Sequence, residues 1–462
     1  MTTPTAPATS STAPAPALDR AMGLLQATAT NVISMVGVGP FLTIPFMVAA
    51  MNGPHVMYAW IAGGILAVMD GLVYAQLGAA LPGSGGSYLY LREAYKPFGI
   101  GRLMAFVFIF QTILVAPLSI AGGAVGFSGY LNYFYPLTAM QGGVIAAVLC
   151  IVMTALLYRD IESIGRLTVV MLGVVLVTVG WVIVAGVFTS SLTQAFTYPP
   201  QAFQFDRVFL VGLGAASLQA MYSYGGYNQV CNIGEEIVNP TKTIPRSIVL
   251  SIVVVAVLYI LMTTAIVGMI PWEEAKTSTT VASSFIARTF SDPGQARIAG
   301  WVMTVLILFV AAASLYAVIL GYSRVPFAAA RDGDFFKVFA KVHPRKHFPH
   351  VSLLVIGLVS LPFCFFTLGQ LVNWLMQVQI MLRFVWQCGA VMLLYHYRKD
   401  IPQPWVMWAY PFPAIISLVL WLYLFFTGPV AGIIFSFAFL AVAAAAYLVF
   451  IRIHPEAKAD QA

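Results

Sequence analysis

Residues 31–45 read NVISMVGVGPFLTIP and lie inside an apolar run that extends from about residue 21 to residue 50. Gly37, Gly39 and Pro40 stand at the centre of this run, where they are expected to interrupt a membrane-spanning helix. An interrupted helix leaves backbone N–H and C=O groups without partners, and in lipid each such group costs several kcal/mol. We therefore expect the break to be buried in protein or to line a polar cavity.

The residues at the break favour a bound carboxylate. Gly37 and Gly39 leave the backbone uncovered by side chains, and Pro40 suits the first turn of a restarting helix. The restarted helix would direct its positive end, with the N–H groups of Val38 and Gly39, toward an anion. The alternative is a kinked helix whose glycines serve only close packing between helices.

The composition indicates a membrane protein. Of the 462 residues, 60% are hydrophobic and 8% are charged, which is too few charges to cover a soluble globule of this size. Apolar runs of the roughly 20 residues that a helix needs to cross a bilayer recur along the chain. No segment shows the period-two alternation of a membrane β-barrel. The sequence therefore predicts an all-α integral membrane protein.

The sequence offers no metal site, cofactor motif or disulfide pattern. Its four cysteines lie inside apolar runs without the spacing of metal ligands, so we expect them to be small core residues. No metal, cofactor or disulfide-linked heavy subunit is predicted. The six histidines fall in or beside expected loops, which argues against an enzyme with catalytic groups at membrane depth.

Twelve spans are predicted, so both ends of the chain lie on one side of the membrane. Lys and Arg are frequent in the connections on that side, whereas the opposite side carries only Arg207, Lys276, Arg288 and Arg297. By the positive-inside rule both termini are cytoplasmic, in the plasma (inner) membrane. The net charge of +7 is thus a topology signal and not a sign of nucleic acid binding. The predicted spans are residues 21–50, 56–81, 97–127, 139–158, 165–188, 206–238, 244–270, 295–330, 350–368, 371–397, 406–427 and 430–452.

The sixth predicted span repeats the peculiarity of the first. Residues 217–240 read SLQAMYSYGGYNQVCNIGEEIVNP, and Gly225 and Gly226 break a run that otherwise looks helical. Interruptions in spans one and six predict an inverted repeat of two five-helix halves, with the binding site at their interface. The expected segments are a disordered cytoplasmic tail at 1–17, the two halves at 18–205 and 206–400, two further helices in 401–452, and a cytoplasmic tail at 453–462.

Several motifs carry a resemblance to a known family. The first break reads GVGPF from Gly37 to Phe41, and the second reads YSYGGY from Tyr222 to Tyr227. They are similar to the GSGIF and FAYGGW motifs of the amino acid–polyamine–organocation transporter superfamily, and within it of the L-type amino acid transporters and their bacterial relatives. Residues 81–90 (LPGSGGSYLY) and 322–344 (YSRVPFAAARDGDFFKVFAKVHP) resemble family segments after spans two and eight.

The resemblance implies a secondary active transporter that works by alternating access, with the substrate held mainly by backbone groups. The N–H groups of Val38 and Gly39 would bind the substrate carboxylate. The carbonyl groups of Met35, Tyr222 and Gly225 would bind its α-ammonium group, and Tyr222 would close over the substrate as an aromatic gate. Gly37, Ser223, Tyr224 and Tyr227 complete the expected substrate-binding residues.

Two departures from the family pattern affect this site. Val38 stands where the family motif often has Ser, and Pro40 removes the next N–H group, so carboxylate binding would rest on two amides. No acidic side chain falls around the expected pocket, so we predict neutral L-amino acids as substrates. A polyamine or cationic amino acid permease is the alternative, and a transporter-like sensor is a further one.

Energy coupling has several candidate residues. Arg166 lies where similar transporters carry a Lys in place of a sodium ion, which predicts sodium-independent transport, although it also suits a positive-inside arginine. Asp70 is an acid at membrane depth and is a candidate for proton coupling or for pairing with another span. Arg383 is either its partner or a snorkelling cation. Glu235 and Glu236 are candidates for a role in gating. The alternative is that they are solvated acids at a helix end. Exchange versus proton symport, and monomer versus dimer, stay open.

Overall fold

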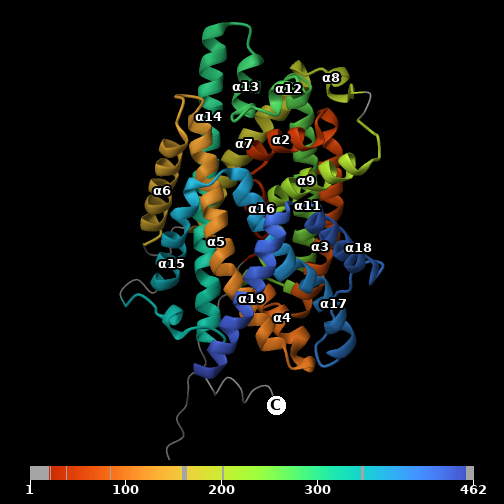
Figure 1. Ribbon diagram of the computed structural model, residues 1–462, viewed down its shortest axis with the longest axis vertical. Helices are drawn as coiled ribbons and strands as arrows, with labels where there is room; N and C mark the ends of the chain where they lie inside the picture. The colour runs from red at the N-terminus through yellow and green to blue at the C-terminus, as the bar shows by residue number, and fades with distance from the viewer. Residues whose placement is uncertain are drawn as a thin grey trace, which may run out of the picture.

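The computed structural model describes residue 20 and residues 22–37, 39–83, 85–158, 164–199, 202–344 and 348–453, with only the backbone for 164–170. Within this part of the chain the structure consists of helices and their connections, and its extended pairing is one isolated parallel bridge, between Met22 and Ile237. The helices run mostly along the long axis of the molecule (Figure 1). The predicted all-α class is confirmed.

The long helices follow the predicted spans in chain order. They are α1 (Leu24–Met35), α2 (Gly39–Met51), α3 (Met57–Ala80), α5 (Gly101–Leu131), α6 (Ala139–Leu156), α7 (Ile164–Thr189), α9 (Arg207–Tyr224), α11 (Pro240–Val267), α14 (Pro293–Arg331), α15 (His350–Ser360), α16 (Leu368–Gln379), α17 (Val385–Tyr397), α18 (Phe412–Thr427) and α19 (Val430–Ile453). Shorter helices connect them: α4 (Ser87–Tyr95), α8 (Leu192–Phe196), α10 (Gln229–Asn232), α12 (Trp272–Ala275) and α13 (Val281–Arg288).

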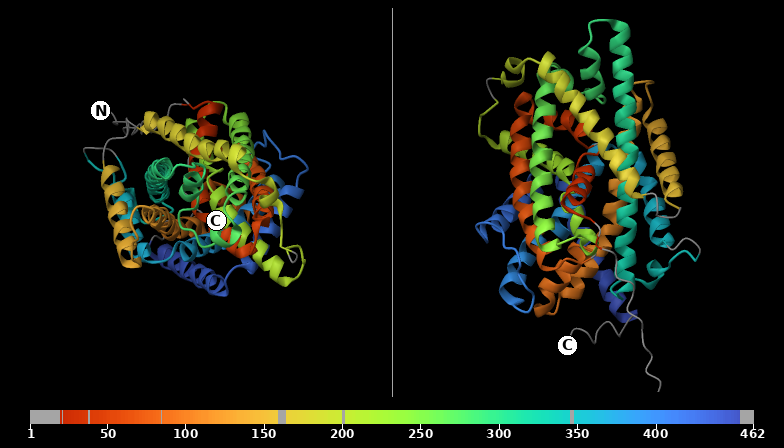
Figure 2. Two further views of the ribbon diagram at one scale, coloured as in Figure 1. Left: turned by 90° about the horizontal axis from the view of Figure 1, so that it is seen from above. Right: turned by 180° about the vertical axis from the view of Figure 1, so that it is seen from behind.

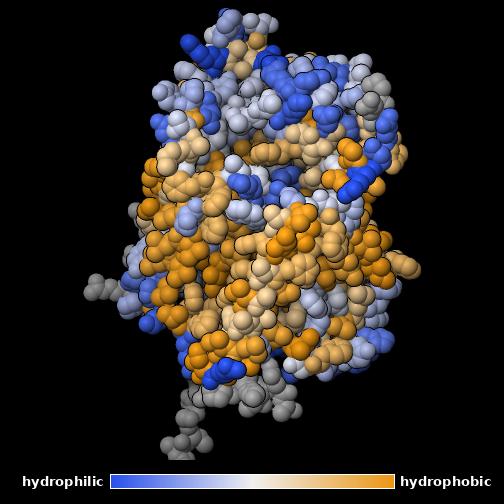
Figure 3. Space-filling view, in the orientation of Figure 1, coloured by the Kyte–Doolittle hydropathy of each residue, from blue (hydrophilic) through white to orange (hydrophobic). Residues whose placement is uncertain are grey.

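Length and hydropathy support a membrane-spanning bundle. The described residues contain 8 helices that are long and apolar enough to cross a bilayer, or 9 if the bent pair α1 and α2 counts as one span. The shorter apolar helices His350–Phe365 and Phe412–Thr427, together with α9, fill the remaining predicted spans. The surface shows a broad hydrophobic belt between two more hydrophilic ends (Figure 3), as expected of a protein embedded in lipid.

Both predicted breaks are present and lie inside the bundle. Between α1 and α2 the chain bends by 47°, and between α9 and α10 it leaves the helix at Gly225, whose ψ of 134° is extended. In the view from behind, α1 is the short red helix between α11 and α14 (Figure 2, right), and it contacts both as well as α7. The helix α2 packs against α9, so the two interrupted spans meet.

The segment that precedes α1 is joined to the end of the sixth span. The N–H group of Met22 donates to the carbonyl oxygen of Glu236 (3.0 Å), and the N–H group of Val238 donates to the carbonyl oxygen of Met22 (3.0 Å). These two bonds form the parallel bridge of Met22 with Ile237. The chain just before α1 and the chain just after α10 are therefore tied together.

An ion-pair cluster ties α4 and α5 to the connection after α14. Asp334 pairs with Arg92 (Nη1–Oδ2, 3.1 Å) and Arg102 (Nε–Oδ1, 3.0 Å), and it accepts a hydrogen bond from the Tyr88 hydroxyl. The side chain of Asp334 is only 7% exposed. Because this buried carboxylate compensates two guanidinium groups, it holds α4, α5 and the connection after α14 together.

A second pair lies beside this cluster. Arg398 lies just beyond the end of α17, and its Nη1 donates a hydrogen bond to the carboxylate of Glu93 on α4 at 2.8 Å. Burial raises the pKa of the Glu93 carboxyl, but the hydrogen bond from Arg398 and the charge of Arg92 outweigh burial and hold this pKa below its ordinary value. Glu93 is therefore ionised at neutral pH and joins the two helices.

Replacing Asp334 by Asn is expected to lower the unfolding temperature of the detergent-purified protein, because two guanidinium groups lose their compensating charge. For so buried a carboxylate we expect a loss on the order of 1–3 kcal/mol. Asp400→Asn is the matched control, since Asp400 pairs with Arg398 but its side chain is 63% exposed, where an ion pair contributes about 1 kcal/mol at most. Equal unfolding temperatures for the two variants would contradict the proposed role of the Asp334 cluster.

Candidate functional site

The two breaks open onto one cavity in the centre of the bundle. Its volume is about 200 Å³, below the roughly 300–1,000 Å³ of sites for drug-sized ligands, which suits a ligand as small as an amino acid. The cavity is lined from α1, α2, α5, α9, α14, α16, the segment after α9 and the π-helical turn Ile380–Phe384 after α16. Its polar lining consists of Ser34, Gln111, Thr112, Ser119, Tyr222, Ser223, Tyr227, Asn228, Gln229, Asn232, Ser314, Tyr322, Gln379 and Arg383.

Helix ends of opposite polarity meet at this cavity. The helix α2 begins at Gly39, so its first free N–H groups and the positive end of its dipole lie at the cavity wall. The helices α1 and α9 end there, at Met35 and Tyr224, and present carbonyl groups and negative dipole ends. This arrangement provides donors for a carboxylate and acceptors for an ammonium group without any charged side chain.

Glycine is required where the breaks approach each other. Gly226 has φ +119°, and a Cβ atom there would lie 2.8 Å from the backbone carbonyl carbon of Ser34. A Cβ atom on Gly37 would lie 2.5 Å from Ser314 Oγ on α14. At Gly226 the neighbouring atoms are backbone, so glycine permits close packing of the broken backbone there, whereas at Gly37 a side chain would require the Ser314 hydroxyl to turn aside. At Gly39 the nearest atoms are 3.5 Å away, so the space there is less restricted.

Tyr259 on α11 is a site residue that sequence reasoning missed. Its hydroxyl lies 2.8 Å from the carbonyl oxygen of Met35 and 3.0 Å from that of Ser223, so it bridges the two broken spans. The side chain is fully buried, against Trp60 and Tyr224. A tyrosine hydroxyl in the middle of an apolar run needs a hydrogen-bond partner. This requirement is the feature of the sequence that could have indicated a structural role for Tyr259. The Met35 carbonyl, predicted to bind the ammonium group, already accepts this bond and has one lone pair left.

Two further contacts hold the breaks together. The hydroxyl groups of Thr43 on α2 and Ser223 on α9 are hydrogen-bonded at 2.8 Å. Asn31 Oδ1 on α1 accepts from the N–H group of Val230 on α10 at 3.0 Å. Asn31 and Tyr259 thus satisfy part of the backbone that the breaks expose, while the Thr43–Ser223 pair links α2 to α9 through side chains alone.

The structure brings most of the predicted substrate-binding residues to the cavity wall. Tyr224 is an exception, because its ring packs on Trp60 and its hydroxyl donates to the Trp60 carbonyl at 3.2 Å, away from the cavity. Val38 lies outside the described residues. Those that line the cavity are Met35, Gly37, Gly39, Tyr222, Ser223, Gly225 and Tyr227.

Asp70 is completely buried on α3 behind the cavity. Tyr227 donates to its Oδ2 at 2.5 Å, and Ser417 and Trp421 of α18 donate to its Oδ1 at 3.1 and 2.9 Å. All three bonds are made with the carboxyl group as acceptor, and its burial inside the bundle opposes a negative charge there. Through Tyr227 this buried acid touches the broken part of span six, and through α18 it touches span eleven.

The gating candidates Glu235 and Glu236 lie away from the cavity wall. Glu235 is exposed and Glu236 is half-buried in the short helix Gly234–Glu236, near the bridge to Met22. The charge of Glu236 acts on Arg324 of α14. Arg166 lies in α7, and its side chain is outside the described part. Among the described residues, no group of three His, Cys, Asp or Glu is placed to hold a metal ion.

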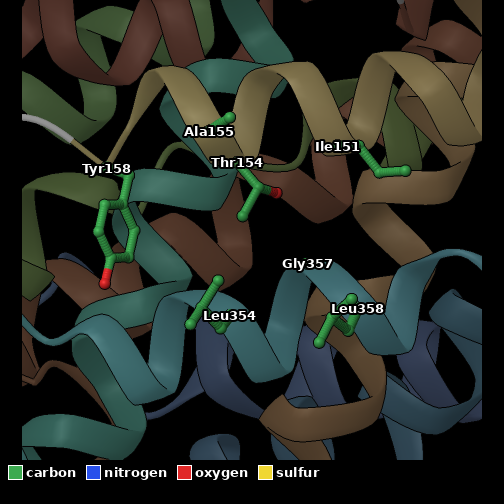
Figure 4. Close-up of a pocket in the computed structure, with 7 residues that line it drawn as sticks. All are labelled: Ile151, Thr154, Ala155, Tyr158, Leu354, Gly357 and Leu358. Atoms are coloured by element: carbon green, nitrogen blue, oxygen red, sulfur yellow. The ribbon is translucent and has the colours of Figure 1, made fainter.

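A second, larger cavity of about 520 Å³ lies at the periphery between α6 and α15 (Figure 4). Its lining is apolar apart from the hydroxyl groups of Thr154 and Tyr158, and the Thr154 hydroxyl already donates to the Cys150 carbonyl at 2.7 Å. It lacks the paired donors and acceptors that a zwitterion needs. The central cavity is therefore the candidate site for a polar ligand.

Comparison with known proteins identifies the family of this chain. A family model described as amino acid permease matches residues 22–452, which is most of the chain. The chain belongs to the amino acid permease family. Its predicted membership of the amino acid–polyamine–organocation superfamily is thereby confirmed, and a permease family agrees with the prediction that it is not an enzyme.

The curated relatives are amino acid transporters of several kinds. The chain is 25% identical over 403 residues to the mouse cationic amino acid transporter 4, covering 83% of this chain and 61% of the relative. It is 27% identical over 421 residues to the mouse large neutral amino acids transporter small subunit 2, covering 88% and 76%. It is 29% identical over 355 residues to the mouse Asc-type amino acid transporter 1, covering 73% and 63%. The match thus spans less than two thirds of the first and the last of these relatives.

Tyr259→Phe is expected to weaken substrate binding, because the carbonyl groups of Met35 and Ser223 lose the hydroxyl that fixes them. A net hydrogen-bond contribution of about 1 kcal/mol corresponds to roughly a fivefold loss in affinity, measured by ligand-dependent thermal stabilisation. Tyr95→Phe is the control, since the Tyr95 hydroxyl also donates to a backbone carbonyl, that of Trp386 at 3.0 Å, but lies away from the cavity. If both variants bind substrate like the unmodified protein, Tyr259 does not organise the site.

Proposed function

We propose that this protein is a secondary active permease that carries amino acids across the membrane by alternating access. The observation that supports it best is the meeting of the positive end of α2 with the negative ends of α1 and α9 at one cavity. A free α-amino acid carries the two complementary charges next to each other. The cavity would bind its carboxylate at the N–H groups near Gly39 and its ammonium group at the carbonyls near Met35, Tyr222 and Gly225.

Neutral L-amino acids are the substrates that we place first. Among the described residues that line the cavity, the one charged side chain is that of Arg383, which would repel a cationic side chain or a polyamine. The similarity to a cationic amino acid transporter keeps the cationic permease as the second candidate. A sensor with the same fold would bind substrate without moving it, so a flux measurement separates it from a carrier.

Asp70 is our candidate for proton coupling. In its ionised form the carboxylate accepts all three hydrogen bonds, but a proton on Oδ2 would require Tyr227 to turn its hydroxyl and accept. Because Tyr227 lines the cavity within the broken span, a proton on Asp70 would change the substrate site. Arg166 stays a candidate for the cation that replaces sodium, which predicts sodium-independent uptake.

Uptake into proteoliposomes tests the proposed function, and Gly226→Ala is expected to abolish it because the added Cβ atom meets the Ser34 backbone. Gly99→Ala is the matched control, since Gly99 also has positive φ (+71°) but no atom within 4 Å of the added Cβ. The unmodified protein should take up a neutral amino acid equally well in sodium and in potassium. Unimpaired uptake by Gly226→Ala, or no uptake of any amino acid by the unmodified protein, would refute the assignment.

We propose the plasma (inner) membrane, with the end that carries α8, α12 and α13 outside and the end that carries α4 and both termini in the cytoplasm. A cysteine at the exposed Thr279 is expected to react with an impermeant thiol reagent added to intact cells, whereas one at the exposed Lys337 is not. The four native cysteines are buried and give a low background. Labelling of Lys337→Cys alone would reverse the orientation.

A further inference from the structure

Arg383 is a cation in the middle of the tenth span that faces the central cavity. It stands in the π-helical turn Ile380–Phe384, which joins α16 to α17. A π-helical turn shifts the side chains that follow it around the helix, and such turns occur frequently at functional sites. Arg383 lines the same cavity as Met35, Gly39 and Tyr222. It therefore faces any ligand that the two broken spans hold.

The guanidinium group is held in place but keeps free donors. Its Nε donates to the Tyr74 hydroxyl at 2.7 Å, and its Nη1 contacts Gln379 Oε1 at 3.4 Å. Its central carbon lies 5.2–5.8 Å from the ring centroids of Tyr74, Phe108 and Phe384. Two of five N–H donors are thus used, both by uncharged partners. The aromatic rings fix the plane of the group and leave its outer N–H groups to the cavity.

Asp70 does not neutralise Arg383 by direct contact. Both residues lie in the described part of the chain, and they form no ion pair there. Two tyrosine rings lie between Arg383 and Asp70. Tyr74 bonds to Arg383 and Tyr227 bonds to Asp70, and the two rings pack edge to face with their centroids 6.1 Å apart. The hydrogen bonds of Asp70 go to Tyr227, Ser417 and Trp421 and none goes to Arg383.

A partly unpaired guanidinium in a low-dielectric cavity favours a ligand that brings an anion. Its planar fork matches a carboxylate, with which it can form two parallel hydrogen bonds. The substrate's α-carboxylate is already assigned to the N–H groups at the start of α2, so a second carboxylate must come from the side chain. This step rests on the proposed function.

We propose that Arg383 forms a side-chain subsite that binds the carboxylate of an acidic amino acid, which extends the substrate range of this permease beyond neutral amino acids. Apart from Arg383, the described polar residues that line the cavity are uncharged, Gln111 and Thr112 among them, so no acid of this lining competes for the guanidinium. The same charge disfavours lysine-like side chains.

The test compares glutamate with glutamine, which have nearly the same shape, by stabilisation of the purified protein and by uptake into proteoliposomes. The unmodified protein should bind glutamate at least as well as glutamine, and lysine least. Arg383→Gln should weaken glutamate binding at least tenfold and change glutamine binding by less than twofold. Arg383→Lys, which keeps the charge but not the fork, should retain part of the glutamate binding.

Arg324→Gln is the control for the loss of a partly buried arginine, because Arg324 on α14 does not line the cavity. It should leave the ratio of glutamate to glutamine binding unchanged. Binding of glutamine without glutamate by the unmodified protein would overturn the subsite and leave the proposed function intact, whereas binding of no amino acid would overturn both. An equal loss of both ligands in Arg383→Gln would mean that Arg383 supports the fold and not the side-chain choice. If Arg383→Gln does not fold, the ranking of glutamate, glutamine and lysine on the unmodified protein still decides.

Discussion

Backbone hydrogen bonding in the middle of the bilayer is the constraint on which the rest of this structure depends. Lipid supplies neither donors nor acceptors, so each peptide group freed by the two breaks needs a partner from the protein or from a ligand. Tyr259 serves the carbonyls of Met35 and Ser223, and Asn31 receives the N–H group of Val230. The backbone N–H and C=O groups at the breaks that have no partner within the protein face the cavity. These groups form the candidate binding site.

The sequence predicts where in the chain the site lies better than it predicts which side chains contact one another there. Glycine and proline inside apolar runs have a direct conformational effect, so the breaks after Met35 and at Gly225 follow from local residue chemistry. The helix boundaries agree with the predicted spans for the same reason, since hydropathy over about 20 residues is a local property. The division into two repeated halves remains a prediction, because it concerns symmetry and not the position of single helices.

Long-range contacts could not be predicted from the sequence. Tyr224 and Tyr227 are three residues apart beside the same break, yet one packs on Trp60 and the other lines the cavity. The conformation of the turn between them sets the direction in which each ring points, and residue type alone does not predict this direction. Two of the three hydrogen-bond partners of Asp70 come from α18, more than three hundred positions along the chain. Charge and depth mark such a residue as important, but only the packing of distant helices says what it touches.

The parallel bridge between Met22 and Ile237 has a mechanical consequence. It joins the chain just before α1 to the chain just after α10, while Asn31 ties the same two segments nearer the cavity. Two segments fastened at both ends cannot swing independently, because separating them would break hydrogen bonds at both places at once. We therefore expect α1 and α10 to move together, so that a ligand that displaces one of them also displaces the other.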